Sequence, residues 1–225
     1  MPGPQRSTSN WRSGSNGVVM EQPRARNEEQ KQRTKQSGAT KADERLIAAP
    51  DEIHTARLLL RKPRASDAPL MFTAYAQDPS VTRYLTWLPH ASLGETRAVI
   101  DRFLIAWERQ EGFCWFLFTN DTGELIGSIA ARPEYDGFNL GFLLARAYWG
   151  RGYMPEAIAA VVDWAFAQPS VSRVSAACDM ENHASARALQ KAGFVRERIL
   201  HEFSVHPNIS SAPRDCFEYA ITRSL

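Results

Sequence analysis

Two glycines, Gly150 and Gly152, mark the segment of the sequence best suited to chemistry. They separate a strand-like apolar run at residues 138–145 from a helical pattern that begins at Pro155. Glycine allows a tight turn and lets the backbone approach a ligand closely. The first N–H groups of a helix have no partner within it and lie at the positive end of its dipole. Such a turn suits a pyrophosphate, to which Arg151 can add a charged contact.

The glycine turn alone has other interpretations. A plain strand–helix turn, with glycine for clearance, explains it equally well. No Gly-Lys-Ser/Thr follows, which excludes a Walker loop, and the third glycine and the downstream acidic residue of a Rossmann fingerprint are missing. A protein that binds ATP or NAD is therefore supported by the turn and by nothing else in the sequence.

A second segment changes this balance. It begins at Asn182, has Ser185 three residues later, and ends at Gly193-Phe194. With this segment included, the chain resembles the GNAT superfamily of N-acetyltransferases, and in particular its RimJ/RimL-type branch, whose enzymes acetylate the N-termini of ribosomal proteins. The resemblance covers roughly residues 55–222, in the family's order and spacing. The motifs that carry it are residues 55–61, Tyr148-Trp149-Gly150-Arg151-Gly152-Tyr153, Glu156-Ala157, Asn182 with Ser185, and Gly193-Phe194.

The resemblance implies a binding site for acetyl-CoA. No CxxC pair or His/Cys cluster with zinc spacing is present in the sequence, so no metal is expected. The strand before the turn would pair through its backbone with the pantetheine arm, and the backbone amides of residues 151–154 would hold the pyrophosphate. Asn182 would hydrogen-bond the pantetheine, although it is also a typical helix N-cap and can do both. For Ser185, a structural role and a contact with the cofactor are equally open. The implied cofactor-binding residues are Leu140, Phe142, Leu143, Leu144, Trp149, Gly150, Arg151, Gly152, Tyr153, Met154, Asn182 and Ser185.

Acetyl transfer to an amine needs a deprotonated amine, a donor for the developing oxyanion and an acid for the leaving thiolate. The candidate catalytic residues are Asn139 and Ser185. Asn139 stands where many relatives carry a glutamate, and an amide cannot accept a proton; Gln190 stands where some carry a tyrosine. Transfer by positioning alone, with a backbone N–H of the strand as oxyanion donor, stays open. Three residues are alternative bases, each of which also fits an ordinary surface position: Glu134, Asp136 and His206.

The sequence therefore predicts an enzyme, an acetyl-CoA-dependent N-acetyltransferase. We expect direct transfer in a ternary complex to a primary amine, either a protein N-terminal α-amine or a small-molecule amine. The protein is expected to be a monomer or a homodimer. The alternative function is a catalytically weak acyl-CoA-binding or sensing module, which Asn139 favours.

Strand and helix patterns alternate along the part of the chain that must position these residues. The order predicts an α/β fold of mixed type: a single GNAT-like domain at residues 55–225, with a mostly antiparallel twisted sheet of about six to seven strands and helices on both faces. Ser92 and Glu95 form a capping box at the start of one helix. The predicted strands are residues 57–61, 113–118, 125–131, 138–145, 171–178, 194–205 and 216–222, and the predicted helices are residues 67–76, 93–107, 155–168 and 182–192.

Composition bounds the rest. Residues 1–50 have nine Lys/Arg against five Asp/Glu, an excess of four, and few large apolar residues, so we expect a disordered basic tail. Cys114, Cys178 and Cys216 are far apart, which favours buried reduced thiols in a cytoplasmic protein. A net charge of +2 gives no reason to expect a specific nucleic-acid partner. No apolar run reaches the ~18–20 residues of a membrane span, so no membrane partner is expected.

Overall fold

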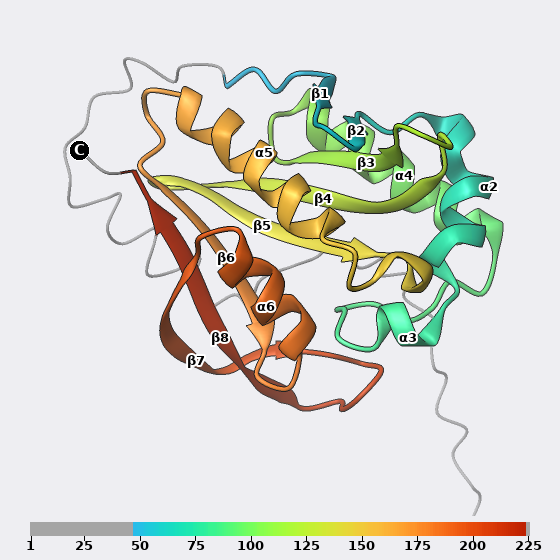
Figure 1. Cartoon of the computed structure of the whole chain (residues 1–225). Helices are drawn as coiled ribbons and strands as arrows, with labels where there is room; N and C mark the ends of the chain where they lie inside the picture. The colour runs from blue at the N-terminus through green and yellow to red at the C-terminus, as the bar shows by residue number, and fades with distance from the viewer. Residues whose placement is uncertain (1–46, 224–225) are drawn as a thin grey trace, which may run out of the picture.

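The predicted strands form one sheet in the computed structural model, which describes residues 47–223 (Figure 1). The strands are β1 (Glu52–His54), β2 (Leu58–Arg61), β3 (Phe113–Thr119), β4 (Leu125–Glu134), β5 (Gly137–Leu144), β6 (Arg173–Asp179), β7 (Val195–Val205) and β8 (Pro213–Thr222). The longer helices are α4 (Leu93–Glu108), α5 (Tyr153–Ala167) and α6 (His183–Lys191). Short helical segments are η1 (Ala65–Asp67), α2 (Ala68–Met71), η2 (Phe72–Ala76), α3 (Pro79–Thr82) and η3 (Arg146–Tyr148).

The sheet has the strand order β1-β2-β3-β4-β5-β6-β8-β7. Every neighbouring pair is antiparallel except β5 and β6, which α5 connects as a crossover. The predicted fold class is therefore confirmed, with eight strands rather than six to seven. The additional strand is β1, whose three residues are too few to establish a period, so that only its pairing with β2 identifies it.

The one parallel pairing is short. β5 pairs with β6 over four positions, from Gly137 opposite Arg173 to Leu140 opposite Ala176, whereas it pairs with β4 as far as Leu144. Beyond Leu140 the two central strands therefore diverge, and the side of β5 that faces β6 has no strand partner. The sheet is split at its centre.

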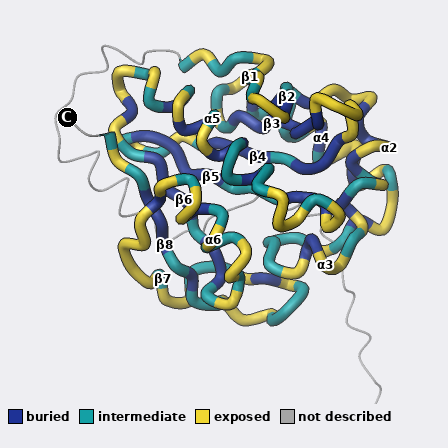
Figure 2. The backbone as a smooth tube through the Cα atoms, viewed as in Figure 1, coloured by how far each residue is buried: buried dark blue, intermediate teal, exposed yellow. Residues whose placement is uncertain are grey.

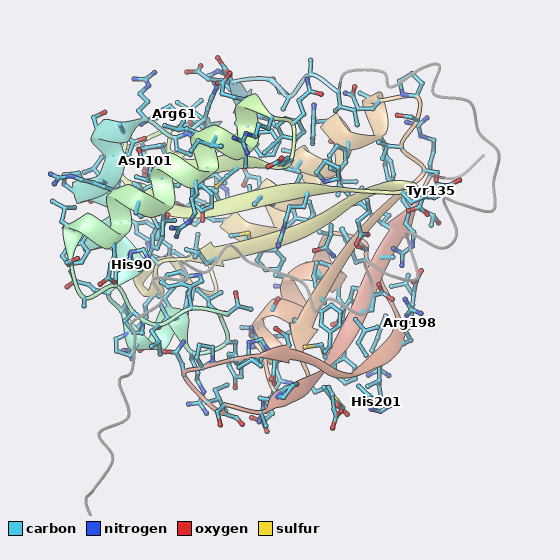
Figure 3. All side chains as sticks on the ribbon, turned by 180° about the vertical axis from the view of Figure 1, so that it is seen from behind. Arg61, His90, Asp101, Tyr135, Arg198 and His201 are labelled. Atoms are coloured by element: carbon cyan, nitrogen blue, oxygen red, sulfur yellow. The ribbon has the colours of Figure 1, made fainter. Side chains whose placement is uncertain are left out.

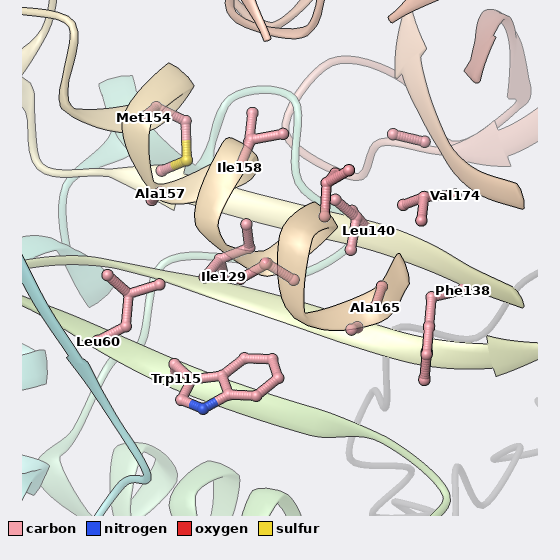
Figure 4. Packing of buried hydrophobic residues seen from close by; sticks show 14 of the residues in the cluster. Leu60, Trp115, Ile129, Phe138, Leu140, Met154, Ala157, Ile158, Ala165 and Val174 are labelled. Atoms are coloured by element: carbon pink, nitrogen blue, oxygen red, sulfur yellow. The ribbon is translucent and has the colours of Figure 1, made fainter. Parts of the chain in front are cut away.

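Apolar side chains hold one helical layer on each face of the sheet (Figures 1 and 2). On the α5 face, Trp115, Ile129 and Phe138 from the strands are buried against Ala157 and Ala165, whose small side chains let the helix approach closely (Figure 4). The other cluster lies under α2, η2 and α4. Viewed from that side, α4, which carries Asp101, covers the part of the sheet near Arg61. Arg198 and His201 lie on β7 at the far end (Figure 3).

Local signals set the ends of the helices as predicted. The Ser92 hydroxyl accepts the Glu95 N–H at 3.3 Å at the start of α4, and the Asn182 side chain accepts the Ser185 N–H at 3.1 Å at the start of α6. The predicted capping box is only half formed, because the Glu95 carboxylate accepts from the Ala91 N–H at 3.0 Å rather than from that of Ser92. Gly193, just after α6, has a φ of 88°, which favours glycine. Within the described residues, no helix is both long and apolar enough to cross a membrane.

Residues 47–54 precede the predicted start of the domain at residue 55, yet they pack against it. The Trp115 indole N–H donates to the Pro50 carbonyl at 2.9 Å, and Ile47 contacts the cluster on the α5 face. The predicted tail, residues 1–50, lies outside the described residues except for its last four.

Gly137 starts the short β5–β6 pairing and leaves no room for a side chain. A Cβ atom there would lie 1.7 Å from the Arg173 carbonyl oxygen. Gly137→Ala is therefore expected to lower the free energy of unfolding by about 1–3 kcal/mol, the usual effect of overpacking, in urea denaturation.

Gly94→Ala in α4 is the matched control. The nearest atom to its added Cβ would be 3.6 Å away, and alanine favours a helix over glycine by about 0.5–1 kcal/mol. The same chemical change should thus stabilise the protein at residue 94. Equal effects at the two positions would contradict the close approach of β5 and β6.

Candidate functional site

The divergence of β5 and β6 opens into a cavity of about 730 Å³. Its walls come from the end of β5, the turn that leads into α5, the start of α6 and the segment around α3. Ten of the twelve implied cofactor-binding residues line it: Phe142, Leu143, Leu144, Trp149, Gly150, Gly152, Tyr153, Met154, Asn182 and Ser185. Leu140 lines a second, smaller cavity instead, and the Arg151 guanidinium lies 5.4 Å from the Tyr148 ring centre.

The unpaired edge of β5 can bind an extended ligand through its backbone. The Ala145 N–H donates to the Ile126 carbonyl on β4 at 2.7 Å. Because N–H and C=O groups alternate in direction along a strand, those of Leu144 and Phe142 face away from β4, toward the gap. The Trp149 indole N–H donates to the Leu144 carbonyl at 2.6 Å. The N–H and C=O of Phe142 and the N–H of Leu144 are therefore the backbone groups in position for a ligand.

The turn before α5 has the conformation that its glycines predict. Gly150 and Gly152 have φ values of 76° and 81°, in the left-handed region that favours glycine. α5 begins at Tyr153, two residues before the predicted start at Pro155. Its first N–H groups have no acceptor inside the helix, so this end of the cavity suits an anion.

Cationic side chains surround the same cavity, and the sequence analysis missed them. Four of the lining residues carry a positive charge and one, Glu181, a negative charge. The cations come from three separate segments of the chain, so no local motif could have identified them. They are Arg83, Arg146, Arg187 and Lys191.

The second cavity, of about 120 Å³, adjoins the first. The two share the lining residues Tyr84, Leu85, Phe142, Asn182 and Ser185. The second cavity is also lined by residues of β5 and β6, and by Phe203, Ser204 and His206 from the last hairpin. A ligand that fills the large cavity can thus present its end to a second molecule in the small one.

The small cavity contains a charged cluster centred on a buried carboxylate. The Asp179 carboxylate accepts from the Arg214 Nε at 2.6 Å and from the Glu181 N–H at 2.9 Å. Burial would raise the pKa of Asp179, but these hydrogen bonds hold it below its ordinary value. The His206 Nε2 lies 3.6 Å from an Asp179 oxygen. Burial lowers the pKa of His206 despite this carboxylate, which keeps the imidazole neutral at neutral pH.

The structure separates the three alternative bases. His206 lines the small cavity, whereas Glu134 and Asp136 line neither cavity. The Glu134 carboxylate instead accepts from the Ser175 hydroxyl at 3.0 Å. The Ser175 oxygen in turn accepts from the Asn139 amide N–H at 3.0 Å.

The two candidate catalytic residues lie close to the junction of the cavities. Asn139 lines the small cavity and is 6 % exposed, with its amide directed to Ser175. Ser185 lines both cavities and lies next to Cys178, the pKa of which burial raises to about 11. Cys114, Cys178 and Cys216 are all free and buried. Within residues 47–223, no group of three or more His, Cys, Asp or Glu side chains is arranged to hold a metal ion.

Comparison with known proteins places this geometry in context. A sequence model of the acetyltransferase (GNAT) domain matches residues 57–195, more than half of the chain. The uncharacterized N-acetyltransferase YoaA of Bacillus subtilis (strain 168) is 29% identical over 174 residues, which cover 76% of this chain and 96% of YoaA. The uncharacterized N-acetyltransferase p20 of Bacillus licheniformis is 26% identical over 156 residues, covering 68% of this chain and 87% of p20.

Solved structures share the fold at lower identity. A GNAT acetyltransferase from Bacillus anthracis has a TM-score of 0.66 at 24% identity, covering 76% of this chain and 98% of its own. The microcin C7 self-immunity acetyltransferase MccE, solved with acetyl-CoA and AMP, has a TM-score of 0.70 at 16% identity, covering 79% and 99%. RimL, the ribosomal L7/L12 α-N-protein acetyltransferase, solved with coenzyme A, has a TM-score of 0.68 at 19% identity, covering 76% and 97%.

The lowered pKa of His206 predicts a pH-dependent stability. Between that folded value and the unfolded value of about 6.5, the unfolded chain binds more protons, so stability falls as pH falls through this window. His206→Gln removes this contribution. Urea denaturation at about pH 7.5 and about pH 5.5 should therefore show a smaller loss of stability in the variant than in the wild type.

Two other groups do not interfere with this comparison. Burial also lowers the pKa of His90, but His90 is present in both proteins and its contribution cancels. Asp179, with its lowered pKa, loses its contribution at lower pH, below about 3.9. An identical pH dependence in the two proteins would show that burial does not control protonation of His206.

Proposed function

The chain belongs to the GNAT family of acetyltransferases, and we propose that it moves an acetyl group from acetyl-CoA to a primary amine by direct transfer in a ternary complex. The predicted family and enzyme class are thus confirmed. The observation that carries the finer proposal is the pair of adjoining cavities at the split in the sheet, one large and cationic, the other small.

The large cavity fits the chemistry of acetyl-CoA. A polyanionic cofactor suits four cationic side chains and the start of α5. The pantetheine arm is an extended chain of amides, which matches the backbone groups of Phe142 and Leu144 at the edge of β5. Asn182 lies at the junction, where its amide can donate to the pantetheine while its oxygen caps α6. The thioester would then reach the small cavity.

The small cavity supports a narrow acceptor. At about 120 Å³ it has room for the reacting amine and little more, so the rest of the acceptor must lie outside. A protein N-terminus meets this requirement because its α-amine is at the end of a linear chain. A small linear amine is the second candidate, and bulky polycyclic amines are disfavoured.

We assign proton removal from the amine to His206, directly or through a water molecule. Of the three alternative bases it is the one that lines the small cavity, and its lowered pKa leaves it neutral and able to accept a proton at pH 7. A backbone N–H of β5 remains the donor for the developing oxyanion. We assign to Ser185, which lines both cavities, a hydrogen bond that stabilises the leaving thiolate; the proton that the thiolate takes up is the one removed from the amine.

The test of the function is release of free thiol from acetyl-CoA by the purified protein. The acceptors are peptides with free N-termini, polyamines, amino acids and aminoglycosides. We expect release with the peptides. Binding of acetyl-CoA without release by any acceptor would favour the sensing module that Asn139 suggests, and absence of acetyl-CoA binding would refute the proposal.

Asn182 can be tested separately for its two roles. Aspartate caps a helix as well as asparagine does, but it cannot donate to an amide carbonyl. The free energy of unfolding of Asn182→Asp should therefore lie within about 0.5 kcal/mol of the wild-type value. The variant should bind acetyl-CoA about tenfold more weakly, which corresponds to a loss of roughly 1.4 kcal/mol of binding free energy. Calorimetric titration and urea denaturation give the two quantities. Asn182→Ala is the comparison, because it should lose about 1 kcal/mol of stability as well. Unchanged acetyl-CoA affinity in Asn182→Asp would leave the residue with the cap alone.

His206→Gln should lower the rate at pH 7 by roughly 10²-fold or more, the usual contribution of a general base. The difference from wild type should shrink as pH rises above about 8, where an N-terminal α-amine is already deprotonated. In the wild type, kcat/KM corrected for the fraction of deprotonated amine should fall only below about pH 6.5, because burial keeps His206 neutral above that value. A constant difference between the two proteins at every pH would argue against proton transfer to His206.

A further inference from the structure

Arg57, just before β2, reaches the glycine turn from a position 94 residues earlier in the chain. Its Nη1 donates to the Arg151 carbonyl at 3.0 Å. Its Nε and Nη2 each lie 2.6 Å from the Glu156 Oε2 in the first turn of α5. The guanidinium also lies 4.6 Å from the ring centre of Tyr153. One planar side chain thus connects the turn to the helix that follows it.

Both carboxylate oxygens of Glu156 accept hydrogen bonds in this arrangement. Its Oε1 accepts from the Thr55 hydroxyl at 2.7 Å and from the Arg57 backbone N–H at 2.9 Å. Burial would raise the pKa of Glu156, but these contacts and the Arg57 guanidinium hold it below its ordinary value. The carboxylate is therefore ionised and engaged on both oxygens, which excludes it as the base of the reaction and leaves it as an anchor for Arg57.

The contact with the Arg151 carbonyl has a consequence for the next N–H. In a trans peptide the C=O and the N–H point in opposite directions, so the orientation of one fixes the other. Arg57 does not line the large cavity, whereas Gly152 does. With the Arg151 carbonyl held toward Arg57, the Gly152 N–H points away from Arg57. Without that contact the peptide can rotate, because Gly152, whose φ follows the peptide, accepts either sign of φ.

We propose that Arg57 is a positioning residue for acetyl-CoA: by holding the Arg151 carbonyl and Glu156, it turns the Gly152 N–H toward the pyrophosphate. This inference rests on the proposed use of acetyl-CoA. Arg57 itself contacts protein groups rather than phosphate. Thr55, Arg57 and Glu156, which the sequence shows only as separate motifs, form one unit that shapes the anion site.

The test uses two acetyl donors that differ in the pyrophosphate. Acetyl-CoA has it, and S-acetyl-pantetheine ends before it. Arg57→Lys keeps the charge but lacks the planar fork that reaches both partners. We expect it to weaken acetyl-CoA binding about tenfold, the worth of a hydrogen bond to a charged group, and to leave S-acetyl-pantetheine binding unchanged. The dissociation constants come from calorimetric titration of the full-length protein.

Arg61→Lys is the matched control. Arg61, the last residue of β2, binds a carboxylate, that of Asp67, at 2.8 Å, but it makes no contact with the glycine turn. Its substitution removes a comparable ion pair and should not change the ratio of the two dissociation constants, even if the melting temperature falls.

The outcomes separate the two proposals. A ratio that changes in Arg57→Lys and not in Arg61→Lys supports the positioning role. If Arg57→Lys weakens both donors equally or neither, the positioning role is refuted and the use of acetyl-CoA stands. A wild-type protein that binds neither donor refutes both.

Discussion

The four-residue pairing between β5 and β6 is the constraint on which the site depends. Gly137 lets the two backbones meet at one end, and beyond Leu140 they separate. Everything that could bind a ligand follows from this divergence: the exposed edge of β5, the room for a cavity of about 730 Å³, and the junction with the smaller cavity. A fully paired sheet with the same residues would have none of these. The apolar cluster on the α5 face includes residues from both sides of the split, so the two parts of the sheet stay joined in one core while their backbones separate.

The parts of the fold that local chemistry determines could be predicted from the sequence. Glycine at 150 and 152, the Ser92 and Asn182 caps and the apolar strands each act over a few residues, and the structure has them where the sequence indicates. β1 could not be predicted from the sequence, because only its pairing with β2 makes these three residues a strand. The early start of α5 was missed because Pro155 marks a first turn without fixing which residue of that turn it occupies.

The site could be predicted only in part, for the same physical reason. The residues of the glycine turn lie next to one another in the sequence, and so do those of the α6 cap. Each group is therefore visible as a motif. The four cations around the cavity and the contact of Arg57 with the turn join segments far apart in the chain. For His206 the sequence offered a residue type but not a location, and burial against Asp179 is what distinguishes it from Glu134 and Asp136.

The split also separates the strands into two groups. β1 to β5 pair mainly with their neighbours in sequence, and β6, β7 and β8 form a second group, so each half is built largely from its own contacts. Such halves are the usual cooperative units of partial opening. In the sheet the two groups are joined by a four-residue ladder, and the apolar cluster under α5 continues across it. A molecule bound across that boundary contacts both halves and binds only when they are together. Occupancy of the site is therefore expected to add contacts between the two groups of strands and to raise the free energy needed to separate them.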